Sequence, residues 1–283
     1  MKESAKARLG LIASMVIFGS IGIFRRYIPL PSALIGACRG LMGAAFLLLV
    51  TLARKQRPDG KTIRPQLVKL LLSGAAMGFN WILLFEAYRY TSVATATLCY
   101  YMAPVFVILA SPFLLKEKHT PGKLLCVLAA VIGVALVSGV GEGGSITGVL
   151  LGLGAAVLYA TVVLMNKTFT GVSTEDRTML QLGSAGAVLL PYTLLAESLS
   201  GVTLDGTSLL MLLVVGAVHT GLAYWLYFGS MKALPAQTVA LYSYIDPIVA
   251  ILLSALILGE ALTPLGILGA VLVLGATLVS ERV

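Results

Sequence analysis

Long apolar stretches dominate the pattern of hydrophobic and polar positions along this chain. Ten of them are bounded by charged residues, Pro or Gly, and each is long enough to form a helix. Since about 20 apolar residues cross the hydrocarbon core of a bilayer, each stretch predicts a transmembrane helix. The ten predicted spans cover residues 9–27, 33–53, 66–88, 91–114, 122–140, 146–167, 177–197, 208–231, 235–258 and 264–280. We therefore expect an all-α membrane protein with ten transmembrane helices.

The composition points to lipid as the main solvent of this surface. Of the 283 residues, 58% are hydrophobic and only 11% are charged, which is too few to cover a soluble domain. The formal net charge of +8 would suggest nucleic acid as the partner of a soluble protein. In a membrane protein the same excess is typical of basic cytoplasmic loops. We expect a lipid bilayer, and no nucleic acid, as the partner.

The basic residues are distributed unevenly between the two sides of the predicted spans. With the amino terminus inside, the cytoplasmic segments hold most of the Lys and Arg residues, including the cluster in residues 54–69. The outer loops and helix ends then hold only Arg25, Arg26 and Arg89. Because loops rich in Lys and Arg stay on the cytoplasmic side, we predict that both termini are cytoplasmic. The expected location is the inner (plasma) membrane, as a multi-pass protein.

The most informative feature of the chain is an internal repeat. Shifting the sequence by 143 residues aligns the third to fifth spans with the eighth to tenth spans without a gap. The matched pairs include Gly78/Gly221, Phe85/Phe228, Thr95/Thr238, Tyr101/Tyr244, Pro104/Pro247, Ser111/Ser254, Glu117/Glu260, Thr120/Thr263 and Pro121/Pro264. An odd number of spans per repeat puts the halves in opposite orientations, so we expect a five-helix repeat over residues 1–140 and an inverted one over 141–283. Inverted repeats are typical of secondary transporters, whose substrate site lies near the midplane between the halves.

Two motif pairs occupy matching places in the two halves. Tyr101-Met102-Ala103-Pro104 precedes Lys116-Glu117-Lys118-His119-Thr120, and Tyr244-Ile245-Asp246-Pro247 precedes Gly259-Glu260-Ala261-Leu262-Thr263. With these motifs and with Arg39 in the second span, the whole chain resembles the drug/metabolite transporter (DMT) superfamily, in particular its EamA-type members. The resemblance implies a ten-helix transporter with a small-molecule substrate. It leaves the substrate open, because the superfamily handles amino acids, amines, nucleotide sugars, choline and drugs.

Two charged residues, Arg39 and Asp246, fall well inside predicted spans, where an unpaired charge is costly. Asp246 lies about 11 residues into its span, near the midplane, and the neighbouring Pro247 opens the local helix. Asp246 is therefore a candidate for binding a cationic group and for coupling transport to protons. Arg39 is a candidate for holding a substrate carboxylate or phosphate. The alternative also stays open, namely that Arg39 pairs with Asp246 or with Glu86 for structural reasons.

Five further residues at comparable depth complete the predicted site. The aromatic ones either line the site, where they can attract an amine, or pack in the membrane as belt residues. His219 is either a packing residue or a group that couples to protons. Tyr242 and Asp246 have i,i+4 spacing, which predicts that they share a helix face. The predicted substrate-binding residues are Arg39, Asn80, Trp81, Tyr101, His219, Tyr242 and Asp246, while Tyr159, Tyr224, Trp225 and Tyr244 fall at similar depths.

Two other patterns indicate structural roles. Glu117 and Glu260 end their helices at opposite faces, and their matched positions predict one role twice, such as accepting hydrogen bonds from loop N–H groups before Thr-Pro starts the next helix. Small residues spaced by four, as in Ala129/Gly133 and Gly266/Ala270, predict close helix packing.

The function that the sequence favours is secondary transport. The chain has neither a Walker A loop nor room for an ATPase domain, so an ion or substrate gradient must drive transport. We expect an exporter or exchanger of a small polar or amphipathic metabolite, such as an amino acid or amine, by alternating access. A membrane-embedded enzyme and a channel or passive scaffold are the alternatives, although no nucleophile constellation supports catalysis. We expect no cofactor and no metal, with protons as an open coupling partner, in a monomer or homodimer.

Overall fold

The computed structural model describes residues 2–55, 58–114, 120–138, 145–197, 199, 205–234, 239 and 242–280. These residues form helices and connecting loops, and they contain no strand. The helices are α1 (Lys2–Arg26), α2 (Ser32–Ala53), α3 (Gly60–Ile63), η1 (Arg64–Gln66), α4 (Leu67–Tyr90), α5 (Val93–Tyr100), α6 (Ala103–Leu114), α7 (Pro121–Ser138), α8 (Ile146–Asn166), α9 (Thr174–Ala196), α10 (Gly206–Gly216), η2 (Ala217–Leu222), α11 (Ala223–Ala233), α13 (Ile245–Leu258) and α14 (Pro264–Ser280).

The described helices suit a protein that crosses the membrane many times. Eight helical segments are long and apolar enough to span a bilayer, and α13 and α14 are shorter apolar helices of 14 and 17 residues. All ten predicted spans overlap these segments. The all-α class is thus confirmed for the described residues, while the count of ten crossings and the cytoplasmic termini stay predictions.

Two predicted spans are interrupted at matching positions of the repeat. The span predicted over 91–114 is divided into α5 and α6 by a turn at Tyr101–Met102, and α13 begins only after a turn at Tyr244. Proline explains both interruptions, because Pro104 and Pro247 have no N–H to donate to the carbonyl four residues earlier. Those two carbonyls belong to Tyr100 and Ser243. The sequence offset of 143 residues therefore recurs as a structural break in each half.

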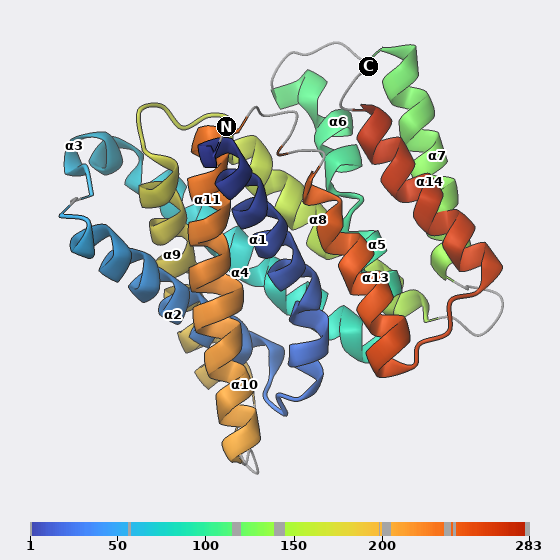
Figure 1. Ribbon diagram of the computed structural model, residues 1–283, viewed down its shortest axis with the longest axis horizontal. Helices are drawn as coiled ribbons and strands as arrows, with labels where there is room; N and C mark the ends of the chain where they lie inside the picture. The colour runs from blue at the N-terminus through green and yellow to red at the C-terminus, as the bar shows by residue number, and fades with distance from the viewer. Residues whose placement is uncertain are drawn as a thin grey trace.

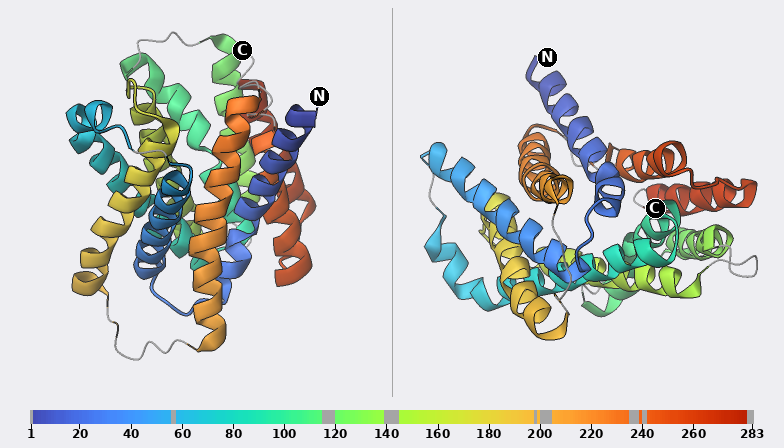
Figure 2. Two further views of the ribbon diagram at one scale, coloured as in Figure 1. Left: turned by 60° about the vertical axis from the view of Figure 1, so that its left-hand side comes forward. Right: turned by 90° about the horizontal axis from the view of Figure 1, so that it is seen from below.

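Helices at equivalent places in the two halves pack directly against one another through glycines. Gly40 of α2 lies against the backbone of α9, where an added Cβ would come within 2.8 Å of the Gly186 nitrogen. Gly133 of α7 and Gly269 of α14 make the same kind of contact, which confirms the close packing predicted from Gly133. Figures 1 and 2 show these two pairs on opposite sides of the molecule. No side chain larger than hydrogen fits at either crossing without moving backbone.

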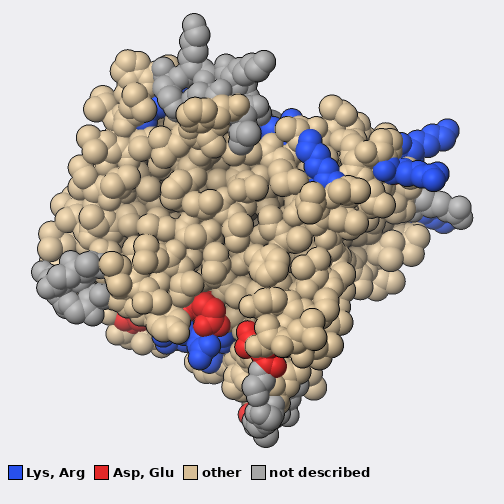
Figure 3. Space-filling view, turned by 180° about the vertical axis from the view of Figure 1, so that it is seen from behind, with Lys and Arg blue, Asp and Glu red and all other residues tan. Residues whose placement is uncertain are grey.

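Both chain termini lie at one end of the helix bundle (Figure 1), which we call the terminal end. Lys and Arg gather along the terminal end of the face shown in Figure 3, and below them extends a broad band of other residues. The carboxylates on that face cluster at the opposite end, where Lys or Arg side chains lie beside them. This separation of charge towards the two ends, with an uncharged band between, matches a helix bundle that crosses a bilayer.

At the opposite end, Glu260 follows α13 and bonds to residues of α1 and α5. Gly259 ends α13 in the left-handed conformation, with φ +66°, and turns the chain so that Glu260 faces the start of α5. The Glu260 carboxylate accepts hydrogen bonds from the Val93 N–H at 2.9 and 3.2 Å, and it pairs with Arg26 of α1 at 2.8 Å. The acceptor role predicted for Glu260 is therefore present, but the N–H group belongs to α5 rather than to the loop before Pro264. Glu117 lies outside the described residues.

Candidate functional site

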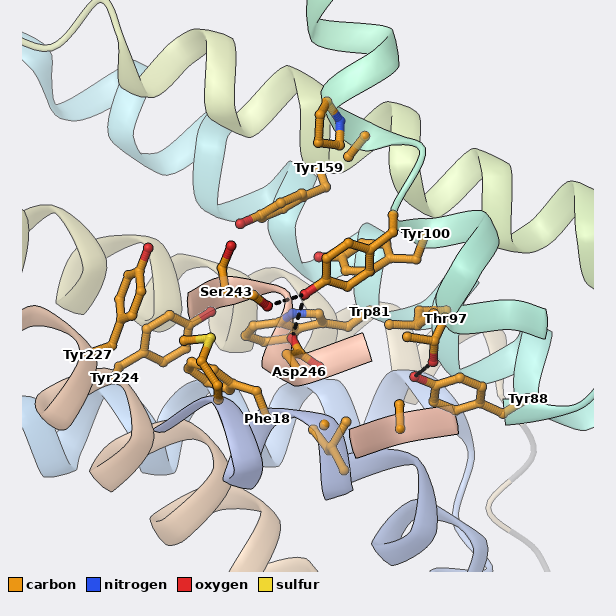
Figure 4. Close-up of a pocket in the computed structure, with 18 of the residues that line it drawn as sticks. Phe18, Trp81, Tyr88, Thr97, Tyr100, Tyr159, Tyr224, Tyr227, Ser243 and Asp246 are labelled. Carbon is orange, nitrogen blue, oxygen red and sulfur yellow. Dashed lines mark hydrogen bonds between the residues drawn. The ribbon is translucent and has the colours of Figure 1, made fainter. Parts of the chain in front are cut away.

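A cavity of about 310 Å³ lies in the centre of the bundle, with walls from α1, α2, α4, α5, α6, α8, α11 and α13. Aromatic side chains make up much of its lining (Figure 4): Phe18, Trp81, Tyr88, Tyr100, Tyr101, Tyr159, Tyr224 and Tyr227. Within the part of the chain that the structure describes, the cavity lining also holds one cation, Arg39, and one carboxylate, Asp246. Helices of both halves contribute, as expected of a site between the two repeats.

Asp246 is held at the helix break of the second half by a tyrosine from the break of the first half. The Tyr101 hydroxyl lies 3.0 Å from the Asp246 carboxylate and 3.3 Å from the Ser243 carbonyl, and the dashed lines in Figure 4 mark both contacts. That carbonyl is the one that Pro247 deprives of its helical donor. Tyr101 therefore replaces the missing backbone donor and orients the carboxylate at the same time.

Arg39 is buried and has no carboxylate partner among the described residues. Its Nε donates to the Thr220 hydroxyl at 3.1 Å, and its guanidinium carbon lies 4.2 Å from the centre of the Trp81 ring. Thr220 sits in the π-helical segment η2 and donates its own hydroxyl hydrogen to the Val215 carbonyl, which leaves its oxygen as an acceptor. The structural pairing of Arg39 with Asp246 or Glu86, which the sequence left open, does not occur within the described part of the chain. Glu86 pairs instead with Arg89 at 3.0 Å.

Four of the seven predicted site residues line the cavity, namely Arg39, Trp81, Tyr101 and Asp246. The structure does not bring the other three to its wall. Asn80 is buried against α8 and donates to the Ala155 carbonyl. His219 lies between the Ser20 hydroxyl, at 3.0 Å, and the Val214 carbonyl, at 3.4 Å.

Tyr242 is the third residue outside the cavity lining. It packs against the apolar cluster that contains Leu11 and Met15. The i,i+4 argument assumed one continuous helix and did not bring Tyr242 to the cavity wall that Asp246 lines. A turn at Tyr244 lies between the two residues, and α13 begins only after it.

Sequence reasoning missed several residues that the cavity brings together. The lining also includes Tyr88, Thr97, Tyr100 and Tyr227. The hydroxyl oxygens of Tyr88 and Thr97 lie 3.5 Å apart. Tyr100 lies four residues before Pro104, so its carbonyl is the one that this proline leaves without a helical donor, and this position could have pointed to it. Among the described residues, no three His, Cys, Asp or Glu side chains gather as a metal site requires. The chemistry available in the cavity is therefore that of one fixed cation, one carboxylate and several aromatic hydroxyls.

Comparisons with known proteins assign this fold to a family. The EamA-like transporter family matches the chain twice, over residues 5–139 and 146–281. The "Uncharacterized transporter YxxF" of Bacillus subtilis is 31% identical over 263 residues, which cover 91% of this chain and 84% of that protein. A "Probable amino-acid metabolite efflux pump" of Salmonella typhimurium is 28% identical over 87% of this chain and 84% of its own length.

A solved crystal structure shows the same fold. It superposes with a TM-score of 0.69 and covers 98% of each chain, at 22% sequence identity. Family and relatives alike point to transport rather than to catalysis. With two family matches that together span nearly its whole length, this multi-pass membrane protein belongs to the EamA-like transporters of the DMT superfamily.

Proposed function

We propose that this protein is a secondary transporter of a small metabolite that carries both an acidic and a basic group, an α-amino acid being the simplest such molecule. The observation that carries the proposal is the cavity in which Arg39 and Asp246 are both present but form no pair with each other. Two opposite charges in one cavity of low polarity attract a ligand whose own charges complement them.

The two charged groups divide the cavity into different subsites. The guanidinium of Arg39 is supported by Thr220 and Trp81, so its remaining N–H groups suit the carboxylate of a ligand. Asp246 lies among tyrosine rings and suits an ammonium group, which aromatic faces also attract. A cavity of about 310 Å³ is at the lower end of the range for small-molecule pockets. An amine without a carboxylate would leave Arg39 uncompensated, so the site favours amino acids over simple amines.

We infer alternating access as the transport mechanism. The equivalent breaks at Tyr101 and Tyr244, and the direct packing of α2 on α9 and of α7 on α14, support an arrangement of two inverted halves, residues 1–140 and 141–283. The Lys and Arg side chains along the terminal end in Figure 3 support cytoplasmic termini in the inner (plasma) membrane. The efflux pump named above supports export, with exchange as its reversible form. A monomer or a homodimer is compatible with this mechanism.

Asp246 is the proposed coupling group for protons. Proton transfer to this carboxylate would remove its attraction for an ammonium group, so protonation and substrate binding would compete at one position. The Tyr101 hydroxyl, at 3.0 Å, can donate to the carboxylate when no substrate is bound. Such competition is sufficient to couple an outward flux of substrate to an inward flux of protons.

The substrate proposal is tested by counterflow in proteoliposomes with matched ligands. The ligands are an α-amino acid, its amide without the carboxylate, and its analogue without the amino group. Arg39→Gln should weaken half-saturation for the amino acid by about 30- to 100-fold, the equivalent of one buried charged hydrogen bond of about 2–3 kcal/mol, and should leave the amide unaffected. Unchanged half-saturation for the amino acid in folded Arg39→Gln would remove the proposed carboxylate subsite. Flux that does not saturate would favour a channel, and chemical conversion of the ligand would favour an enzyme.

The coupling proposal is tested with Asp246→Asn in the same vesicles. The variant should lose flux driven by a pH gradient but retain exchange at saturating substrate, because a neutral group still permits the conformational change. A correctly folded Asp246→Asn protein with unchanged pH-driven flux would exclude Asp246 from coupling.

A further inference from the structure

A second hollow lies on the outer surface of the bundle, where α6, α8 and the start of α4 meet. It encloses about 670 Å³, and its walls are apolar, with Phe106, Leu109 and Phe113 on α6 and Val157 and Leu164 on α8. Phe113 is 86% exposed and Leu109 is 40% exposed, so this groove opens to the surroundings of the bundle. In a membrane protein those surroundings are acyl chains.

Among the described residues that line this groove, Lys69 is the one cation. Its ammonium nitrogen lies 5.3 Å from the centre of the Phe169 ring, and no carboxylate of the described chain lies within 4.0 Å of it. The two hydroxyl groups in the lining, those of Thr161 and Thr168, donate to the carbonyls of Val157 and Met165. Their hydrogens are thus already used, and Lys69 is the group that can neutralise an anion.

Lys69 lies at the terminal end of the groove. It is the third residue of α4, and the basic residues Lys61 and Arg64 precede it in α3 and η1. Figure 3 shows Lys and Arg along this end of the face and an uncharged band below them. The groove is therefore apolar along its length and positive at one end, which is the charge distribution of a site for an anionic amphiphile.

We propose that this groove binds one anionic phospholipid, with an acyl chain along α6 and α8 and the phosphate at Lys69. Under the proposed orientation, the terminal end faces the cytoplasm, and basic pockets at that surface attract acidic head groups. A water-soluble peptide would have to displace lipid from an apolar wall without gaining a partner for its backbone. A phospholipid satisfies the wall and the cation together.

A lipid bound in the groove can affect the central cavity, because α6 and α8 contribute residues to both. Helix α8 presents Val157 and Thr161 to the groove and Tyr159 to the cavity, and α6 begins at Ala103, which lines the cavity. Tyr159 packs on Tyr100 with ring centres 5.3 Å apart. A chain seated between α6 and α8 thus supports the packing that positions two aromatic rings of the cavity, so we expect the lipid to stabilise the folded transporter.

Native mass spectrometry of the purified full-length protein tests this proposal, with phosphatidylglycerol and phosphatidylcholine of the same acyl chains as probes. The wild type should bind phosphatidylglycerol about fivefold more tightly, since one Lys near an anionic head group is worth about 1 kcal/mol. Lys69→Gln should bring the ratio close to one. Lys61→Gln is the matched control: it removes an equal charge from α3, outside the groove lining, and should keep the preference.

A second variant tests the apolar part of the groove. Ala110→Phe fills the groove and should weaken both lipids, and Leu109→Gln replaces it if Ala110→Phe does not fold. Retention of the phosphatidylglycerol preference in Lys69→Gln would overturn the proposal, as would an equal loss in Lys61→Gln, which would indicate diffuse surface charge. If the protein forms dimers instead of binding lipid, the groove is an interface with a second copy of the chain, and this result would also overturn the proposal. These readouts do not depend on the substrate of the transporter.

Discussion

The contacts of Glu260 at the end opposite the termini allow a direct test of what stabilises this helix bundle. Its carboxylate serves two partners of different kinds, the exposed cation of Arg26 and the buried N–H of Val93. The Arg26 side chain is 42% exposed and that of Glu260 is 15% exposed, whereas Val93 is 1% exposed. Solvent can replace the first partner far more easily than the second. We therefore predict an unequal division of the stabilisation.

The magnitudes follow from these exposures. Arg26→Gln removes a partly exposed ion pair, worth about 0.2–1 kcal/mol. Glu260→Ala also leaves the Val93 N–H without its acceptor at the start of α5, which costs about 1–2 kcal/mol more. Glu260→Gln keeps a carbonyl oxygen that accepts from Val93, and should therefore destabilise by only about 1 kcal/mol. The expected order of unfolding free energies is wild type, Arg26→Gln, Glu260→Gln and, lowest, Glu260→Ala.

Reversible SDS unfolding in mixed micelles measures this series, and the double variant Arg26→Gln/Glu260→Ala completes a thermodynamic cycle. The double variant should be no less stable than Glu260→Ala, because the ion pair is already lost. If Arg26→Gln destabilises as much as Glu260→Ala, the ion pair dominates and the argument from the buried N–H is refuted. Proteoliposome flux should also change in Glu260→Ala, since α1, α5 and α13 all contribute to the cavity.

Three further predictions concern packing, a buried amide and pH. Gly40→Ala should lower the unfolding free energy by about 1–3 kcal/mol, because the new Cβ would lie 2.8 Å from the backbone of α9. Gly183→Ala is the control and should be tolerated, because the nearest contact of its Cβ is at 3.7 Å. Equal effects of the two variants in SDS unfolding would contradict this prediction. Asn80→Leu should reduce stability through loss of the bond to α8 while leaving substrate half-saturation unchanged, and a large change in half-saturation would return Asn80 to the site. Hydrogen bonds from Ser208 hold the pKa of Asp205 below its usual value, so its contribution should be present near neutral pH and lost as the pH falls through the acid range. Melting curves across that range should show a weaker acid dependence in Asp205→Ala, and an unchanged acid limb would rule this contribution out.

Much of the fold could be predicted from the sequence because lipid imposes a simple rule on helix length and polarity. The apolar runs predicted the helical segments, and the Pro, Tyr and Glu matches at an offset of 143 residues predicted where equivalent elements lie. The rotation of each helix about its axis could not be predicted. In a chain that is apolar on every side, little in the pattern distinguishes the face towards lipid from the face towards a neighbour. Asn80 and Trp81 show the consequence, because neighbours on a helix point about 100° apart and only Trp81 reaches the cavity.

Depth in the membrane led to four residues that line the cavity and to three that do not, and two of the four also mark a feature of the repeat. Tyr101 and Asp246 lie within the motifs beside Pro104 and Pro247, so the same prolines that break the helices point to them. Tyr242, by contrast, was assigned to the site from a continuous helix, and the turn at Tyr244 interrupts that helix. The partners of Arg39 depend on the π-helical segment at 217–222, which presents Thr220 to it and has no recognisable signal in an apolar run.

The contact of Tyr101 with Ser243 and Asp246 has a consequence for how the halves can move apart. A hydroxyl from one half contacts the interrupted helix of the other, so separation at this point would take its hydrogen bonds away from the Ser243 carbonyl and the Asp246 carboxylate. A ligand ammonium carries three hydrogens and can serve both acceptors in place of the phenol. The bound substrate would then replace the Tyr101 hydroxyl as hydrogen-bond donor while the halves separate. The empty protein would therefore reorient more slowly than the substrate-bound protein. Such a transporter would work as an exchanger, because its reorientation in the opposite direction also needs a bound molecule that donates hydrogen bonds to these acceptors.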